Sequence, residues 1–223
     1  MRLTLIYLTL WFIPLSVFGQ NFGEDMLAIT NSCLSLKSNY TITSAIRAQN
    51  GESRDQIVHV RMAGRSRFYA YDDKTELLIN QDMKIMLNKE FKVLMVDSSR
   101  LRESIDQLPV ELFDTFASVY SSIKFDQISP TEGQYTLVPI AGDFKKIILR
   151  FSSSNYRVTM IKMDAYDRAL DQDYKMTMTY VYSTFTSIPS TSAYVKKSAN
   201  GDLALQPKWQ SFELLNYYTQ QTN

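Results

Sequence analysis

The hairpin NQDMKIMLNKEFKVLMVD, at residues 80–97, decides the fold that the sequence predicts. Its first strand places Met83, Ile85 and Leu87 at alternate positions, which is the period of a β-strand with one apolar face. Its second strand is apolar at every position from 93 to 96. A short run of this kind indicates cover on both faces of the sheet, so the sequence predicts a sheet with further segments packed against it.

Strands of the same period lie on both sides of this hairpin. The clearest alternation has Tyr and Met at every second position from 174 to 182, with mostly Lys and Thr between them. Asn50 and Gly51 form a turn of the kind that joins two antiparallel strands. The predicted strands are residues 39–48, 56–62, 66–72 and 75–81 before the hairpin, and 134–140, 145–151, 156–164 and 174–182 after it.

Two segments have helical spacing instead. Residues 22–34 place apolar side chains on one stripe and carry Glu24 and Asp25 in the first turn, where the helix dipole favours acids. Residues 108–123 have Pro109 near the first helical position, followed by an apolar stripe. We expect this second segment to cover the second face of the hairpin that precedes it. The predicted fold class is therefore α+β, a curved antiparallel sheet with helices as lids.

Residues 1–19 are expected to be a secretory signal peptide. Arg2 precedes an apolar run that ends at Phe18, and small residues stand near the cleavage position. An uncleaved membrane anchor is the alternative, but the run is shorter than the about 20 apolar residues that a spanning helix needs. We therefore predict an exported, soluble, periplasmic protein with a single domain at residues 20–223, which ends in an extended C-terminal segment at 190–223.

The charge balance and the cysteine content exclude nucleic-acid binders and disulfide scaffolds. The chain has 24 basic and 23 acidic residues, whereas a nucleic-acid binder carries a basic excess. The single cysteine, Cys33, cannot form an intrachain disulfide and is expected to be a small buried residue. Stability must then come from the burial of apolar side chains, for which a chain of this length is sufficient.

Residue types that carry catalysis or bind metals are scarce. The single histidine, His59, lies in an alternating strand, so we expect an ordinary strand residue and keep a catalytic histidine as the alternative. Residues 164–173 hold four aspartates but lack the central glycine and terminal glutamate of a calcium loop, so they are expected to form a solvated hairpin loop. Asp72 and Asp73 are expected in a turn. The sequence thus predicts no enzyme, no cofactor and no metal.

Methionine and aromatic residues are the feature that stands out. The chain has ten methionines, and several of them alternate along predicted strands. Because methionine is flexible and polarizable, a face lined with it can adapt to ligands of variable shape, including acyl chains. Packing in an ordinary core is an equally good explanation. Periodicity shows which side chains share a face, but not whether that face encloses protein or a cavity.

The order of the elements and two local stretches resemble the LolA-like family of periplasmic lipoprotein carriers. The stretches are ELLINQDMKIMLNKEFKVLMV, at residues 76–96, and YTLVPIAGDFKKIILRFSSSNYRVTMIKM, at residues 135–163. Both are similar to runs of paired strands in that family. The glutamine after the cleavage position and the abundance of Tyr, Asn and Lys resemble exported proteins of the Bacteroidota.

The resemblance implies an incomplete barrel, with helices packed across its concave side and an apolar cavity between them. In such a cavity a carrier holds a lipid or an acylated lipoprotein without any covalent step. The candidate cavity-lining residues are Ile85, Leu87, Met95, Leu112, Phe116, Tyr135, Leu137, Ile148, Met160, Met176 and Met178.

Two functions remain open at this point. The first is a periplasmic carrier or binder whose partner is a lipid or an acylated protein. The second is an accessory interaction subunit of a cell-envelope assembly or secretion machine, which uses the same scaffold to bind an envelope protein. The polar stretch from Ser190 to Lys208 and the aromatic end WQSFELLNYY favour the second. An enzyme is the third and least supported alternative.

Overall fold

A computed structural model describes residues 22–35, 37–64, 66–98, 118–169 and 171–218. The expected signal peptide at residues 1–19 lies outside the described residues. So does most of the second predicted helix, including Leu112 and Phe116. None of the helices in the described ranges has the length and hydropathy to cross a membrane.

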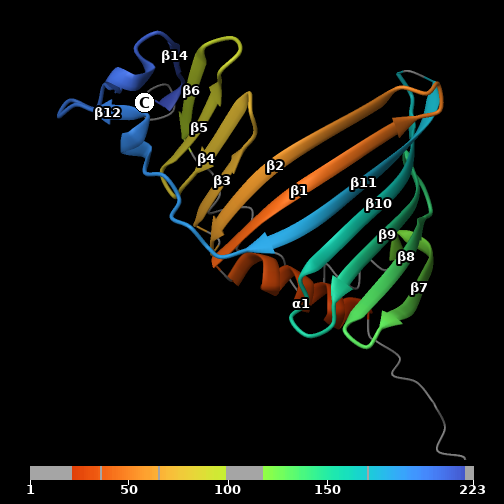
Figure 1. Cartoon of the computed structure of the whole chain (residues 1–223). Helices are drawn as coiled ribbons and strands as arrows, with labels where there is room; N and C mark the ends of the chain where they lie inside the picture. The colour runs from red at the N-terminus through yellow and green to blue at the C-terminus, as the bar shows by residue number, and fades with distance from the viewer. Residues whose placement is uncertain (1–21, 36, 65, 99–117, 170, 219–223) are drawn as a thin grey trace, which may run out of the picture.

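One large, strongly bent sheet of twelve strands forms most of the molecule (Figure 1). Its order is β14-β6-β5-β4-β3-β2-β1-β11-β10-β9-β8-β7, and it does not close into a barrel. All neighbouring strands are antiparallel except β14, which pairs with β6 in parallel. The strands are β1 (Lys37–Ala48), β2 (Ser53–Ala63), β3 (Arg67–Tyr71), β4 (Thr75–Ile79), β5 (Met83–Asn88), β6 (Val93–Ser98), β7 (Tyr120–Ser129), β8 (Glu132–Pro139), β9 (Phe144–Ser152), β10 (Val158–Asp167), β11 (Gln172–Ser183) and β14 (Glu213–Asn216).

Helix α1 (Phe22–Ser35) covers one face of the sheet at one end, and we call this the α1 face. The helix begins where the sequence predicts it, with Glu24 and Asp25 in its first turn. It packs over a cluster that we call the α1 core, whose buried members are Ile29, Tyr135, Leu137, Phe151 and Val158. The fold class is α+β as predicted, but α1 is the one α-helix of any length in the described ranges, so the prediction of several helices across the sheet is overstated.

The last part of the second predicted helix is a strand. Residues 120–123 open β7, the edge strand that pairs with β8. A β-bulge between Tyr120 and Ser122 shifts the register, so that Tyr120 and Ile123 both pack against the α1 core. Their spacing of three residues imitates a helical stripe, and this is why the sequence pattern predicted the wrong element.

The C-terminal segment covers the opposite face of the sheet. After β11 the chain crosses that face and then adds β14 beside β6, since a parallel neighbour requires a crossover connection. Two buried aromatic residues, Tyr194 and Trp209, lie in this crossover. It also contains η1 (Thr191–Ala193), β12 (Val195–Lys197), β13 (Leu203–Leu205) and η2 (Pro207–Trp209), and β12 and β13 form a small separate sheet.

This crossover builds a second cluster, which we call the C-terminal core. Its buried members are Tyr69, Leu78, Met83, Ile85, Leu87, Leu94, Val96, Tyr194, Val195 and Trp209. The hairpin therefore has one face sealed by the C-terminal segment. The cover that the sequence predicts, residues 108–123, lies largely outside the described residues. The other face of the hairpin carries Met86 and Met95, of which Met86 is 38% exposed. The sequence predicted cover on both faces, and the residues that the structure describes fully cover the face toward the C-terminal core.

Candidate ligand-binding face

The side chains of β11 divide the strand into two unlike faces. Tyr174, Met176, Met178, Tyr180 and Tyr182 lie on the α1 face, because successive residues of a strand point to opposite sides. All five are half-buried. A row of large side chains that is neither exposed nor closed over is the surface that an apolar ligand requires. We call these five residues the β11 stripe.

Neighbouring strands widen the stripe. On β1, Ile42 pairs with Tyr180 and Ile46 pairs with Met176. On β10, Ile161 pairs with Met178 and Met163 with Met176. All four of these neighbours are half-buried as well. The α1 face is therefore apolar across three adjacent strands.

One end of the stripe is aromatic and joins the α1 core. The Tyr40 ring centroid lies 5.9 Å from that of Tyr180 and 5.4 Å from that of Tyr182. The Tyr40 hydroxyl donates to Met62 Sδ at 3.5 Å, and Tyr180 packs against the α1 core. Helix α1 thus closes this end of the stripe.

A cationic side chain lies at the same end. The guanidinium carbon of Arg157 lies 4.9 Å from the centroid of the Tyr182 ring, a cation–π distance. Its Nε atom is buried and has no hydrogen-bond partner among the described residues. Within the described ranges no carboxylate forms an ion pair with Arg157.

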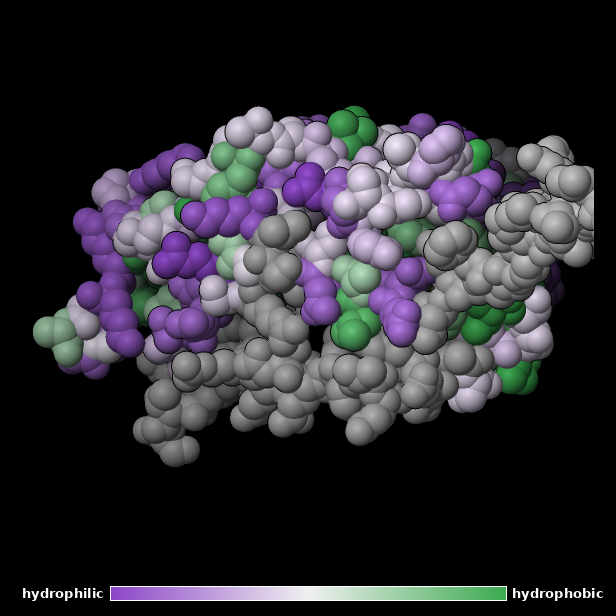
Figure 2. Space-filling view, turned by 90° about the horizontal axis from the view of Figure 1, so that it is seen from below, coloured by the Kyte–Doolittle hydropathy of each residue, from purple (hydrophilic) through white to green (hydrophobic). Residues whose placement is uncertain are grey.

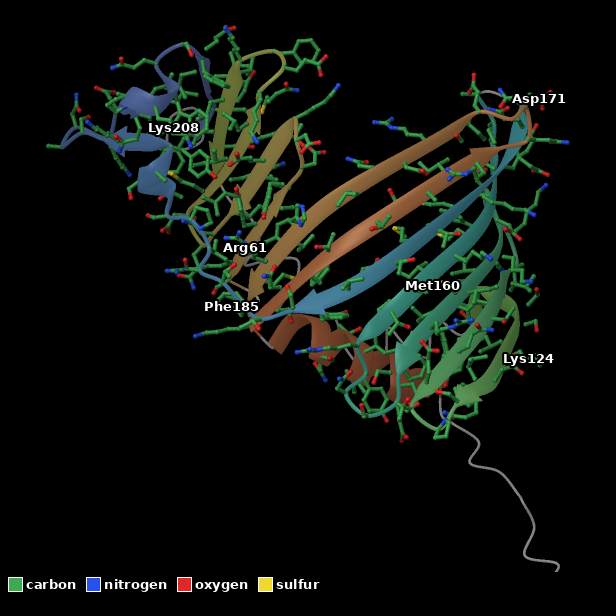
Figure 3. All side chains as sticks on the ribbon, in the orientation of Figure 1. Arg61, Lys124, Met160, Asp171, Phe185 and Lys208 are labelled. Carbon is green, nitrogen blue, oxygen red and sulfur yellow. The ribbon has the colours of Figure 1, made fainter. Side chains whose placement is uncertain are left out.

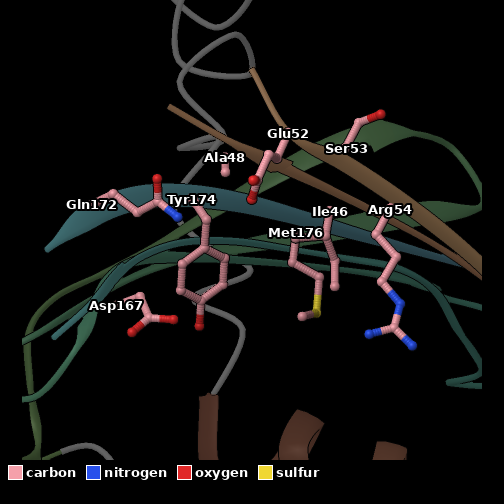
Figure 4. A pocket seen from close by; sticks show the side chains of 9 residues that line it. All are labelled: Ile46, Ala48, Glu52, Ser53, Arg54, Asp167, Gln172, Tyr174 and Met176. Atoms are coloured by element: carbon pink, nitrogen blue, oxygen red, sulfur yellow. The ribbon is translucent and has the colours of Figure 1, made fainter. Parts of the chain in front are cut away.

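The other end of the stripe opens into a pocket of about 610 Å³ (Figure 4). Tyr174, Met176 and Ile46 point into it from the sheet, toward the side on which α1 lies. Its rim is polar, with Arg54 and Asp167 among the lining residues. The described residues that line it are Ile46, Ala48, Glu52, Ser53, Arg54, Asp167, Gln172, Tyr174 and Met176.

A more polar pocket of about 550 Å³ lies between β2 and the β3–β4 turn. His59 borders it, with Nδ1 at 3.1 Å from the Thr41 hydroxyl and its ring stacked on Tyr71 at 4.9 Å. Asp72, also at its border, accepts hydrogen bonds from the backbone of Lys74 and Thr75, which confirms the predicted turn. No group of three or more metal-binding side chains is assembled in the part of the chain that the structure describes.

The predicted aspartate-rich loop is a hairpin between β10 and β11. Asp173 accepts a bond from Lys145 Nζ at 2.5 Å, and Asp171 accepts one from the Tyr166 hydroxyl. Asp167 Oδ1 accepts from the Ala169 amide at 2.9 Å. These carboxylates are occupied by protein donors, as expected for a hairpin loop.

Two carboxylates are held inside the fold. Burial raises the pKa of Asp25 and nearby Glu24 raises it further, whereas the hydrogen bond of 2.5 Å from the Tyr135 hydroxyl, its one side-chain donor among the described residues, lowers it. Burial also opposes ionisation of Glu76, yet its pKa is lowered, because Tyr194, Lys89 and Tyr69 all donate to it. Burial and the neighbouring carboxylate together raise the pKa of Tyr69 to about 12.

The predicted cavity residues do not all lie on one face. Met95, Tyr135, Leu137, Met176 and Met178 are on the α1 face. Four others are on the opposite face: Ile85 and Leu87 are buried in the C-terminal core, while Ile148 pairs with Lys162 of β10 and Met160 pairs with Arg150 of β9 (Figure 3). Tyr135 and Leu137 are buried under α1. Of the described members of the predicted set, Met176 alone lines the pocket at the end of the stripe.

Several residues of this face are missing from the predicted set, for different reasons. Tyr174, Tyr180 and Tyr182 belong to the alternation at 174–182, so their shared face was visible as a period. Arg157 gave no signal, because its position over Tyr182 depends on the pairing of β10 with β11. Ile46 and Arg54 reach the pocket only through the β1–β2 pairing.

No protein-family model and no curated protein sequence matches the chain. Solved structures with a similar fold include an uncharacterized conserved protein from Thermus thermophilus, with 8% identity, a TM-score of 0.45 and coverage of 86% of this chain and 97% of that one. A LolA superfamily protein from Nitrosomonas europaea has 12% identity, a TM-score of 0.36 and coverage of 75% and 94%. The Pseudomonas aeruginosa MucA/MucB complex has 9% identity, a TM-score of 0.41 and coverage of 79% of this chain and 64% of that one. The functional argument therefore rests on the residues of this chain.

Proposed function

We propose that this protein is a non-enzymatic carrier or binder that holds an acyl chain, of a lipid or of an acylated lipoprotein, along its α1 face. The observation that carries the proposal is the β11 stripe. Its five large side chains share one face and stay half-buried, from the edge of the α1 core to an open pocket. A packed core would close over such residues, as it does over Tyr135 and Phe151.

Apolar burial is a sufficient driving force for this mode of binding. Each methylene that leaves water contributes about 0.8 kcal/mol, and no directional bond is needed. Methionine and tyrosine adapt to chains of different shape through rotation of the thioether and through tilting of the ring. Release then requires no chemical step, and the proposed function uses no catalytic residue, cofactor or metal.

A substitution of Met176, in the β11 stripe, offers a direct test of this proposal. In Met176→Arg a charge enters the pocket end of the stripe, and we expect loss of acyl-chain binding with the fold intact. The matched control is Thr179→Arg, on the same strand but exposed on the opposite face. Displacement of a fluorescent fatty acid would measure binding, and circular dichroism would check the fold. Equal binding by the two variants, or no binding by the wild-type chain, would refute the proposal.

Export to the periplasm is part of the proposal. It requires removal of residues 1–19 and recovery of the mature chain from the envelope fraction. The intact mass of the protein isolated from its own host would test this directly. A mass that retains the first nineteen residues would contradict it.

A second candidate, an interaction subunit of an envelope assembly, is favoured by a different surface. Ile140 is 64% exposed, Phe144 and Val119 are 42% and 47% exposed, and the Ile140 amide donates to the Val119 carbonyl. Hydrophobic residues are visible among hydrophilic ones on the surface seen from below (Figure 2). An Ile140→Asp variant that keeps acyl binding but loses a stoichiometric envelope protein in native mass spectrometry would support this second function.

A deletion of the C-terminal segment, residues 190–223, would not separate these two functions. Residues 190–218 contribute Tyr194, Val195 and Trp209 to the C-terminal core. Their removal would expose the buried face of β3 to β6. Point variants on the surface, such as the ones above, are therefore required.

A further inference from the structure

We propose that Arg157 binds the anionic headgroup of the ligand, so that the preferred ligand is an amphiphile with a terminal carboxylate or phosphate. This inference rests on the proposed function and names its substrate class. The observation behind it is the Arg157 guanidinium at the closed end of the β11 stripe, for whose buried Nε no described residue supplies an acceptor.

The backbone of Arg157 is held in place. Its amide donates to Asn155 Oδ1 at 3.0 Å, and its carbonyl accepts from the Ser152 amide at 2.9 Å. The next residue, Val158, is buried in the α1 core. Asn155 in turn accepts a bond from the Ser32 hydroxyl of α1 at 2.8 Å. The Arg157 side chain therefore starts from a fixed point beside the helix and extends over the Tyr182 ring.

The hydrogen-bonding of Arg157 differs from that of other arginines in the chain. Arg47 and Arg168 donate to Asp55 and Asp143, and Arg150 donates to Gln134. Among the described residues, the guanidinium of Arg157 donates no hydrogen bond and has no ion pair, and its Nε is withdrawn from water. A buried donor of this kind is satisfied in nearly all folded proteins, and since no described residue supplies its acceptor, we place that acceptor on the bound ligand.

The chemistry of the side chain specifies that acceptor. A guanidinium presents parallel N–H groups that match the two oxygens of a carboxylate or a phosphate. The Tyr182 ring beneath the guanidinium restricts its position and shields one side of it from water. A neutral headgroup, such as an alcohol, could accept only one weaker bond.

The length of the stripe fits a chain that begins at this headgroup. Tyr182 and Met176 are six residues apart on one strand, a span of about 20 Å. Half of a bilayer's hydrocarbon core is about 15 Å thick, which is the depth that one acyl chain fills. A chain anchored at Arg157 would thus pass Tyr180 and Met178 and end near the pocket.

Two pairs of ligands, each with one chain length, separate the headgroup from the chain. Oleate is compared with oleyl alcohol, and oleoyl lysophosphatidate with monoolein. We expect the wild-type protein to bind the anionic member of at least one pair about tenfold more tightly than the neutral member. The pair with the larger difference identifies the headgroup as carboxylate or phosphate.

The variants are Arg157→Gln and, as a matched control, Arg150→Gln, whose side chain lies on the opposite face and hydrogen-bonds Gln134. Arg157→Gln should lose the tenfold preference and keep its affinity for the neutral ligands, which also shows that it is folded. Arg150→Gln should behave as wild type. Equal wild-type affinity for charged and neutral members, or an unchanged preference in Arg157→Gln, would overturn this inference alone. Failure of the wild-type protein to bind any of the four ligands would overturn the proposed function with it.

Discussion

The two cores of this molecule contain the same residue types, yet they shift the pKa of a carboxyl group in opposite directions. The α1 core lies under a helix on one face of the sheet, and the C-terminal core lies under an irregular crossover on the other. Each contains a carboxylate with tyrosine hydroxyls beside it. The pKa of Asp25 in the α1 core is raised, whereas that of Glu76 in the C-terminal core is lowered.

The number of donors explains this difference. Glu76 receives hydrogen bonds from two tyrosines and an ion pair from Lys89 at 3.1 Å, and together these outweigh the cost of burial. Asp25 receives one described side-chain hydrogen bond, from Tyr135, and this bond does not outweigh the cost of burial. A buried carboxylate therefore strengthens one core and weakens the other, and the variants below test that contrast from the largest expected effect to the smallest.

Trp209→Ala should have the largest effect. The indole is buried, stacks on Tyr194 with ring centroids 5.8 Å apart, and donates from Nε1 to the Ala193 carbonyl at 3.0 Å. Removing it from the C-terminal core should lower the free energy of unfolding by about 3–5 kcal/mol. Urea denaturation would measure the loss, with exposed Gln210→Ala as the control. A loss no greater than that of the control would show that the crossover is not part of the core.

Glu76→Gln should cost about 1–3 kcal/mol at pH 7, because the ion pair with Lys89 is lost and two tyrosine donors face a neutral amide. Since folding lowers the pKa of Glu76, its contribution is present above its ordinary value of 4.5 and is lost as the pH falls through the folded value. Urea denaturation of both proteins from pH 7 to pH 3 should therefore show the difference shrink. A difference that does not depend on pH would contradict the assignment.

Gly133→Ala tests the packing of the α1 core. An added Cβ would lie 2.9 Å from Phe125 Cε2 and 3.0 Å from Phe151 Cζ, so a ring must move. We expect a loss of about 1–2 kcal/mol in thermal or urea unfolding. Thr136→Ala, on the opposite face of the same strand, is the control. An unchanged stability would mean that Phe125, on edge strand β7, moves aside at no cost.

Asp25→Asn should have the smallest effect at pH 7, within about 1 kcal/mol, because the amide oxygen still accepts from Tyr135 and no charge is buried. The pH dependence has the opposite sign to that of Glu76. Folding raises the pKa of Asp25 above its ordinary 3.8, so the wild type gains stability as the pH falls through the folded value and loses it as the pH rises. The free energy of unfolding of the wild type, relative to that of the variant, should therefore increase as the pH falls toward 4, and urea denaturation would measure it. A large loss at pH 7 in Asp25→Asn would show that the ionised carboxylate stabilises this core.

The sequence was sufficient for most of the elements. Helix α1 and the strands from β1 to β6 and β8 to β11 lie where alternation or helical spacing predicts them. Each period also shows which side chains share a face, as in the β11 stripe. These features depend on contacts between near neighbours in the chain, and the sequence records them directly.

Only the tertiary structure decided which faces are covered, and by what. The apolar pattern of the hairpin at 80–97 predicts that other residues pack over it. The described residues that do so on one face are at 188–218, more than ninety positions later. The helical spacing at 120–123 comes from a bulge whose register is set by β8. Arg157 meets Tyr182 because β10 pairs with β11. A period is local, whereas burial and pairing depend on which distant segment lies alongside. The strands and the residues that share a face were therefore largely predictable, and the cover over each face was not.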